Sequence, residues 1–140
     1  MAFTGNFTCN VFKTGLMNGD FDFSADTFYL ALYTNEATLN ASTTAYTATG
    51  EVVADGYTAG GQALTVSTTP TVGSSGTTAY ISFDNVTWTS ALTARGALIY
   101  KAGDNGAVCV LDFGSDKTST ATFTVEFPAS TNTSAIIRIA

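Results

Sequence analysis

The sequence RGALIYKAGDNGAVCVLDFG, residues 95–114, contains two apolar runs separated by a short polar segment. The runs cover residues 97–100 and 107–113, and the segment GDNG, residues 103–106, lies between them. An Asn-Gly pair tolerates the positive φ angles that tight hairpin turns require. The stretch therefore predicts two neighbouring antiparallel strands joined by a turn.

Alternating apolar and polar residues predict further strands on both sides of this hairpin. In DTFYLALYT, residues 26–34, the side chains of Phe28, Leu30 and Leu32 recur at every second position, which is the period of a sheet with two unlike faces. Three more segments continue this habit, and an apolar run follows near residue 140. These segments are QALTVST (62–68), AYISFDNVTW (79–88), TSTATFTVEFP (118–128) and SAIIRIA (134–140).

One helix is predicted near the N-terminus. Cys9, Phe12 and Leu16 recur at spacings of three and four residues, which places them on one face of a helix. Asn18 and Gly19 then supply a stop, because glycine readily adopts the left-handed conformation that ends many helices.

These elements predict an all-β fold: an antiparallel β-sandwich, jelly-roll-like, with one short N-terminal helix, in a single domain over residues 1–140. The segment PTVGSSGTT, residues 70–78, has the composition of a mobile surface loop, and the strands on either side are too few to form separate domains. The expected core is drawn from ten alternating positions: Phe28, Leu30, Leu32, Ile81, Phe83, Leu98, Val108, Val110, Phe123 and Val125.

Charged residues are few, and most of them are acidic. The chain has 11 acidic and 5 basic residues, so its formal net charge is -6 and a polyanion would be repelled. We therefore expect no direct contact with nucleic acid. Charged residues make up 11% of the chain, against about a quarter in ordinary soluble domains, and threonine is the commonest residue. Hydroxyls, amides and small side chains should cover most of the surface.

The sequence carries neither the pattern of an export signal nor that of a membrane span. Residues 1–15 lack the basic start and the long apolar run of a signal peptide, and no later stretch approaches about 18 consecutive apolar residues. We expect a soluble protein made in the cytoplasm. Cys9 and Cys109 are then expected to be reduced and buried, with a disulfide between them as the less favoured alternative.

The sequence lacks the residues of the common catalytic and metal sites. It contains no histidine, which removes Ser-His-Asp and Cys-His arrangements and histidine metal sites. The turn DFDFSAD, residues 20–26, begins like a calcium loop, but Ala25 and Ala31 stand where an EF-hand requires glycine and glutamate. We interpret its aspartates as a solvated turn that caps the next strand. No catalytic, metal-binding or cofactor-binding residue is predicted, and we do not expect an enzyme.

A glycosidase stays open as an alternative, because it needs only two carboxylates across a shared cleft. The candidate pairs are Asp112 with Asp116 and Glu51 with Asp55. The glycines of GYTAGG, residues 56–61, do not form a phosphate loop, because the lysine and the strand-to-helix setting are missing. They favour a bulge or a sharp turn.

A carbohydrate-binding surface is a second alternative. Such surfaces use exposed aromatic side chains, and Tyr46, Tyr57 and Trp88 are the candidates. We favour packing in the core or at its rim for these three side chains, because large aromatic residues are mostly buried.

Two long segments of the sequence and one short one resemble a family of small virion proteins of tailed bacteriophages. They cover residues 12–65, 94–119 and 134–140, and their most specific parts are ALYT, AYTATGEV, GYTAGG and LDFGSDKT. The sequence is similar to the capsid cement, or decoration, proteins of this group. The resemblance implies a structural protein that binds the outer surface of an assembled capsid and ties neighbouring major capsid protein subunits together. A tail or fibre component that binds a carbohydrate or another receptor is the alternative.

Four aromatic residues are our candidates for the contact surface. Tyr46 and Tyr57 lie among threonine, alanine and glycine, which suits binding by shape, backbone hydrogen bonds and aromatic anchors. Phe3 and Phe7 precede any regular element, and we expect this arm to reach a neighbouring molecule more readily than its own core. We also expect a homodimer, with a trimer as the alternative.

Overall fold

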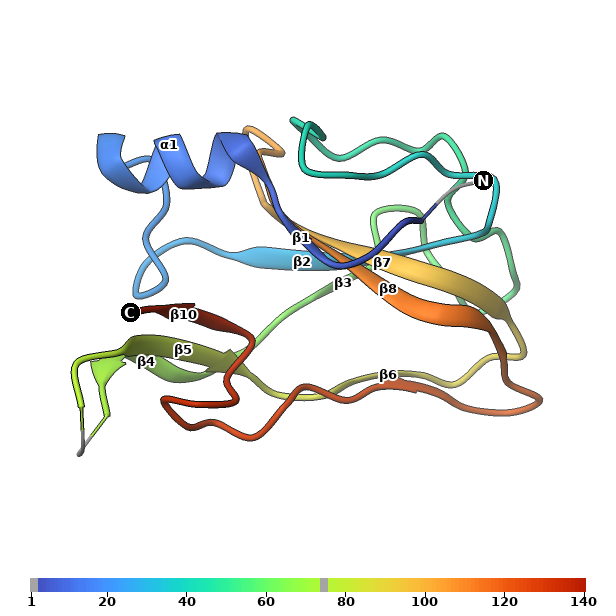
Figure 1. Ribbon diagram of the computed structural model, residues 1–140. Helices are drawn as coiled ribbons and strands as arrows, with labels where there is room; N and C mark the ends of the chain where they lie inside the picture. The colour runs from blue at the N-terminus through green and yellow to red at the C-terminus, as the bar shows by residue number, and fades with distance from the viewer. Residues whose placement is uncertain (1–2, 74–75) are drawn as a thin grey trace.

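A computed structural model describes residues 3–73 and 76–140 as antiparallel β-sheets with one short helix (Figure 1). The all-β prediction is confirmed, because the helix contains only nine residues. The elements are β1 (Phe7–Thr8), α1 (Asn10–Asn18), β2 (Phe28–Tyr33), β3 (Gln62–Ala63), β4 (Val66–Val72), β5 (Ala79–Phe83), β6 (Val86–Trp88), β7 (Thr93–Lys101), β8 (Ala107–Thr118), β9 (Phe123–Val125) and β10 (Ile137–Ile139).

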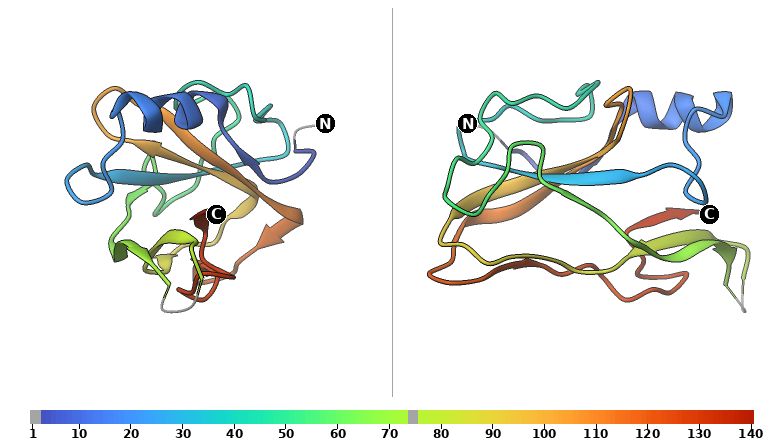
Figure 2. Two further views of the ribbon diagram at one scale, coloured as in Figure 1. Left: turned by 60° about the vertical axis from the view of Figure 1, so that its left-hand side comes forward. Right: turned by 180° about the vertical axis from the view of Figure 1, so that it is seen from behind.

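The strands form two layers. A five-stranded sheet in the order β1-β8-β7-β2-β3 makes one layer. The other layer contains a three-stranded sheet, β10-β5-β4, and a two-stranded sheet, β6-β9. Figures 1 and 2 show these smaller sheets below the large sheet, while α1 and the long connection after β2 lie above it. The large sheet is therefore covered on both faces.

The central hairpin forms as the sequence predicts. β7 and β8 pair antiparallel, and Asn105 and Gly103 in the turn have φ angles of 63° and 102°. Both strands are longer than their apolar runs, since the pairing continues to Thr93 opposite Thr118. The extra residues of β8 are polar and mostly exposed, so backbone hydrogen bonding extends this strand beyond its hydrophobic pattern.

The prediction that β2 has unlike faces is wrong, because both of its faces are buried. Ala31 lies opposite Leu98, and Leu98 lies opposite Val110, so these three residues share one face of the sheet. Leu30 lies on the other face. All ten predicted core residues are buried, and those of the large sheet lie on both of its faces.

The helix prediction is confirmed in its end and in part of its apolar stripe, because Leu16 is only half-buried. Cys9 and Phe12 are buried, and Gly19 ends the helix in the left-handed conformation with φ 79°. The amide of Asp20 donates to the carbonyl of Gly15 at 2.8 Å, which is a C-terminal capping bond of the helix. The ring of Phe21 then folds back against Phe12, with 5.0 Å between the ring centroids.

Two strand boundaries differ from the predictions. Residues 70–72 belong to β4, not to a loop, and Pro70 is tolerated because β4 is an edge strand whose register shifts there. Gly73 and residues 76–78 lie outside regular structure. The strand predicted over 118–128 shrinks to β9, because residue 118 is still part of β8 and the amide of Phe127 bonds to the Asn85 side chain instead of a ladder.

Both cysteines are free and buried, as predicted. Burial raises the pKa of the Cys9 thiol to about 11 and that of Cys109 to about 12. Both thiols therefore stay protonated at neutral pH and pack as small apolar side chains.

Candidate functional site

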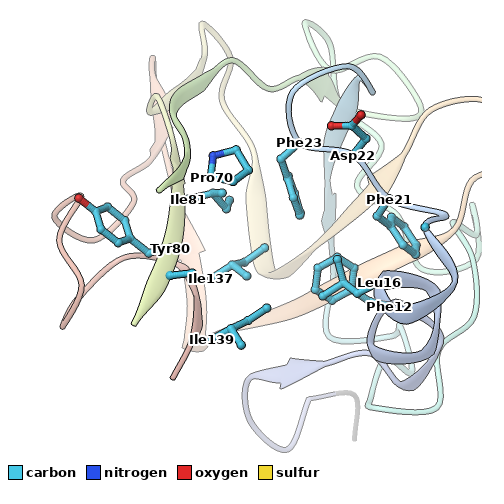
Figure 3. Close-up of a pocket in the computed structure, with 12 residues that line it drawn as sticks. Phe12, Leu16, Phe21, Asp22, Phe23, Pro70, Tyr80, Ile81, Ile137 and Ile139 are labelled. Carbon is cyan, nitrogen blue, oxygen red and sulfur yellow. The ribbon is translucent and has the colours of Figure 1, made fainter. Parts of the chain in front are cut away.

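A groove opens between α1 and the three-stranded sheet (Figure 3). It consists of two adjoining hollows of about 360 Å³ and 740 Å³. Both hollows share four wall residues, Phe12 and Leu16 on one side and Ile137 and Ile139 on the other. We call this feature the α1–β10 groove.

Local structure explains why the walls of the α1–β10 groove are apolar. The helical spacing that buries Phe12 also directs Leu16 toward the groove. On the opposite wall, Ile137 lies directly across from Ile81 in the β10–β5 pair, so both side chains point the same way. The ring of Phe23 lies between the two walls and forms part of the floor of the smaller hollow (Figure 3).

Large apolar side chains are exposed around this groove. Within residues 3–73 and 76–140, the four large hydrophobic residues that are more than half exposed are Met17, Val53, Val72 and Ile139. Met17 and Ile139 line the larger hollow, at 82% and 57% exposure. Val72 follows two residues after Pro70, which lines the smaller one. Such clustering on an otherwise polar surface is typical of a contact site, whereas an isolated exposed residue such as Val53 is ordinary.

Charge is distributed unevenly along the groove. Lys13 and Arg138 line the larger hollow, and the side chains described there include no Asp or Glu. Asp22 is at the other end, where it lines the smaller hollow. The Asp22 carboxylate accepts the amide of Ser24 at 2.8 Å, so this group is occupied in a local turn.

A second polar cluster lies inside the protein, under the connection that follows β2. The Glu51 carboxylate is buried and accepts three hydrogen bonds: from the Tyr46 hydroxyl at 2.6 Å, the Tyr57 hydroxyl at 2.7 Å and the Gly60 amide at 2.8 Å. The Tyr57 hydroxyl also accepts the Leu32 amide at 2.8 Å. Burial, reinforced by the hydrogen bond to Glu51, raises the pKa of Tyr46 and Tyr57 well above the usual value. Because these donors satisfy the buried carboxylate, the cluster has a structural role. We call Glu51, Tyr46, Tyr57 and Gly60 together the clasp.

The structure places two of the four proposed contact residues in the interior. Tyr57 is 9% exposed and Phe3 is buried in its own chain, so neither side chain is on the surface. Phe3 packs against Gly96 and Arg95 instead of reaching away from the domain. Phe7 is half-buried in β1, and Tyr46 is half-buried with its ring stacked on Tyr100 at 4.8 Å. The four residues also do not form one cluster: the phenylalanines belong to the N-terminal arm and β1, and the tyrosines to the clasp.

The other candidate residues from the sequence make contacts within the fold. Trp88 is buried beside Tyr57 at 5.8 Å, which confirms packing in the core. Asp112 pairs with Arg95, and its pKa is low because hydrogen bonds from Gly114 and Arg95 outweigh the effect of burial. Glu51, the first member of the other carboxylate pair, belongs to the clasp.

The aspartates of the acidic turn, residues 20–26, bond to groups in and beside the turn. The Asp26 carboxylate accepts the amide of Asp22 at 2.8 Å, and Lys101 lies 3.9 Å from Asp26. Within the residues that the structure describes, no group of three Cys, Asp or Glu side chains is arranged to hold a metal ion. No helix in the same part of the chain is long and apolar enough to span a membrane.

The predicted turn at GYTAGG is confirmed by its backbone. Gly56, Gly60 and Gly61 all have positive φ angles. A Cβ atom on Gly61 would lie 1.8 Å from the Leu30 carbonyl oxygen, so this position requires glycine for close approach to β2.

Comparison with known proteins gives no further assignment. Scans of protein-family models, curated proteins and solved structures each found no match to this chain.

The sequence patterns do not predict that Met17 and Ile139 line a groove. Met17 lies next to the buried stripe of the helix, and Ile139 alternates with Ile137 in the last strand. Both are apolar residues beside positions that are already buried or half-buried, and this is the sequence feature that could have indicated a contact surface. However, α1 and β10 are more than 100 residues apart in the sequence. No local pattern brings them together.

Proposed function

We propose that this protein is a structural virion protein that binds the outer surface of a tailed-phage capsid and cements neighbouring major capsid protein subunits against internal DNA pressure. The observation that carries the proposal is the α1–β10 groove, an apolar hollow with exposed Met17 and Ile139 at its rim. A surface of this kind suits stable contact with another protein. The resemblance of the sequence to capsid cement proteins supplies the class of partner.

Net charge supports the outer surface of the shell as the location. A chain with a formal charge of -6 is repelled by packaged DNA. The same acidic balance does not oppose contact with a protein shell, provided that the contact itself is mainly apolar. Because a cement binds the intact lattice and not the disrupted one, its binding free energy stabilises the shell by mass action.

Two of the aromatic candidates for sugar binding lie in the interior, which weakens the receptor-binding alternative. A platform for stacking a sugar requires exposed rings, and Trp88 and Tyr57 are buried. We therefore favour cementing over receptor recognition.

The experiment compares phage heads that carry the protein with heads that lack it. Heads without the protein should assemble but release DNA at a lower temperature. Ile139→Asp places a charge at the rim of the groove and should reduce occupancy on the heads, whereas Val53→Asp makes the same change at a residue that is 95% exposed and does not line the groove. Unchanged release temperature on removal of the wild-type protein would contradict the cement function.

Self-association is a separate part of the proposal. We propose a homodimer as the form that binds the shell, with a trimer as the alternative. Sedimentation of the free protein over a range of concentrations measures this. A concentration-independent monomer would contradict self-association before binding.

A further inference from the structure

The free edge of β10 faces the larger hollow of the α1–β10 groove. In the three-stranded sheet β10 is an edge strand, and among the described residues it pairs only with β5, through Ile137 to Ile81 and Arg138 to Tyr80. Across the hollow from it stand Lys13, Leu16 and Met17 of the helix. An edge strand offers unpaired backbone groups to any extended chain that lies beside it.

We propose that the α1–β10 groove binds one extended segment of the major capsid protein, which adds a strand to β10 and carries apolar side chains and a carboxylate. The choice of partner rests on the proposed cement function. Strand addition supplies backbone hydrogen bonds, and alternate side chains of the added strand enter the pockets on one face. The apolar walls formed by Phe12, Leu16 and Ile137 receive these side chains.

Charge complementarity specifies the carboxylate. Lys13 and Arg138 are two of only five basic residues in the chain, and both are exposed at the same hollow. None of the ion pairs among the described residues involves either of them. Arg138 donates to the carbonyl of Thr133, which holds its guanidinium near the groove and uses one of the five N–H donors that a guanidinium carries. An acidic side chain on the segment is attracted to this end.

The same charges disfavour a second copy of this chain as the occupant. A two-fold contact through the groove, centred on β10, would place Arg138 opposite Arg138 of the second copy and bring the two Lys13 side chains toward each other. Like charges directly opposite each other on paired strands are destabilising. The homodimer therefore uses another surface, and the groove remains open to the capsid.

The first test measures binding of the purified protein to heads that lack it, by co-sedimentation. Lys13→Glu with Arg138→Glu should weaken binding by about tenfold or more, because two attractions become repulsions. Lys117→Glu is the matched control, since Lys117 is exposed on β8 and does not line the groove. Lys13→Glu alone is a second variant that leaves the bond from Arg138 to Thr133 intact. Thermal unfolding of each variant verifies that it folds.

The second test identifies the occupant. A photo-crosslinking amino acid at Met17, which is 82% exposed at the rim, should attach to one acidic, apolar segment of the major capsid protein, and the same group at Val53 should not. Crosslinking to a second copy of this chain would overturn the inference. So would unchanged binding of the double charge variant to heads, although the cement function would survive that result. Failure of the wild-type protein to bind heads would instead overturn both.

Discussion

The Tyr57 hydroxyl donates a 2.7 Å hydrogen bond to the Glu51 carboxylate, six residues away, and both residues belong to the connection between β2 and β3. The same hydroxyl accepts the Leu32 amide of β2. Gly60 binds the same carboxylate oxygen at 2.8 Å. One buried acid therefore organises a loop segment that has little regular structure of its own.

Glu51→Gln should destabilise the protein by about 2–3 kcal/mol, because an amide offers only one acceptor oxygen and its NH₂ group would face a donor. Urea unfolding at pH 7 measures the change in the free energy of unfolding. Glu36→Gln is the matched control, because Glu36 is exposed and its side chain has no hydrogen bond to a described residue. Equal stability of the two variants would contradict the structural role of the clasp.

Raising the pH well above neutral should destabilise the folded state through the buried thiols and Tyr57. The thiols of Cys9 and Cys109 titrate near 9 when unfolded, but at about 11 and about 12 when folded, and the pKa of Tyr57 is also raised from 10 by burial and by Glu51. A raised pKa in the folded state contributes stability that is complete below the unfolded value. That stability is lost as pH rises toward the folded value. The free energy of unfolding should therefore be level from neutral pH to about pH 9 and fall at higher pH.

Urea titrations at pH 7, 9, 10 and 11 check this slope, and Cys109→Ala should make it shallower. A level curve up to pH 11 would contradict the assigned burial of these groups.

The sequence predicts the elements whose stability is local. The hairpin of β7 and β8 has its turn residues and its apolar runs side by side, and α1 has its stripe and its glycine stop within eleven residues, 9–19. These signals suffice because the interacting groups are close in the chain.

Long-range contacts explain what the sequence does not predict. The tyrosines of residues 45–57 read as surface anchors because nothing adjacent to them shows that Glu51 and the Leu32 amide would bind their hydroxyls. Burial of the second face of β2 likewise depends on a connection that folds over it without forming strands, as Figure 2 shows. The groove needs β10 to return beside α1.

Gly61→Ala should be much more damaging than Gly19→Ala. The two glycines have nearly equal φ angles, 80° and 79°, so the backbone strain of alanine is similar at both. A Cβ atom at Gly61 meets the Leu30 carbonyl oxygen at 1.8 Å, whereas nothing lies within 4 Å at Gly19. We expect a loss of about 1 kcal/mol at Gly19 and several times more at Gly61. Thermal and urea unfolding measure both losses. Similar losses would show that the β2 backbone at Leu30 shifts to accommodate the added Cβ atom.

Phe3→Ala should lower the stability of the isolated protein by about 3–5 kcal/mol, as expected for truncation of a buried phenylalanine. Phe7→Ala should cost less, because Phe7 is only half-buried. Unfolding of the purified protein in the absence of capsids is the measurement. If Phe3 instead served a neighbouring molecule, its loss would leave this stability unchanged and reduce only binding to heads.

Asp112→Asn should reduce stability at neutral pH and also flatten its decline in acid. Hydrogen bonds from Gly114 and Arg95 hold the pKa of Asp112 below its ordinary value of 3.8, despite the opposing effect of burial. A lowered pKa contributes stability that is present above the unfolded value and is lost as pH falls through the folded value. The wild-type protein should therefore lose stability below about pH 4, and the variant should lose less over the same range.

Asp116→Asn is the control for the Asp112 variant. Asp116 is exposed on the same strand, and the ion pairs found among the described residues do not involve it. Unfolding free energies of all three proteins at pH 7, 5, 4 and 3 give the slopes. Parallel curves for the wild type and Asp112→Asn would mean that the ion pair with Arg95 contributes no pH-dependent stability. A flatter curve for Asp112→Asn alone would show that its pair with Arg95, which lies at the register shift between β7 and β8, contributes pH-dependent stability.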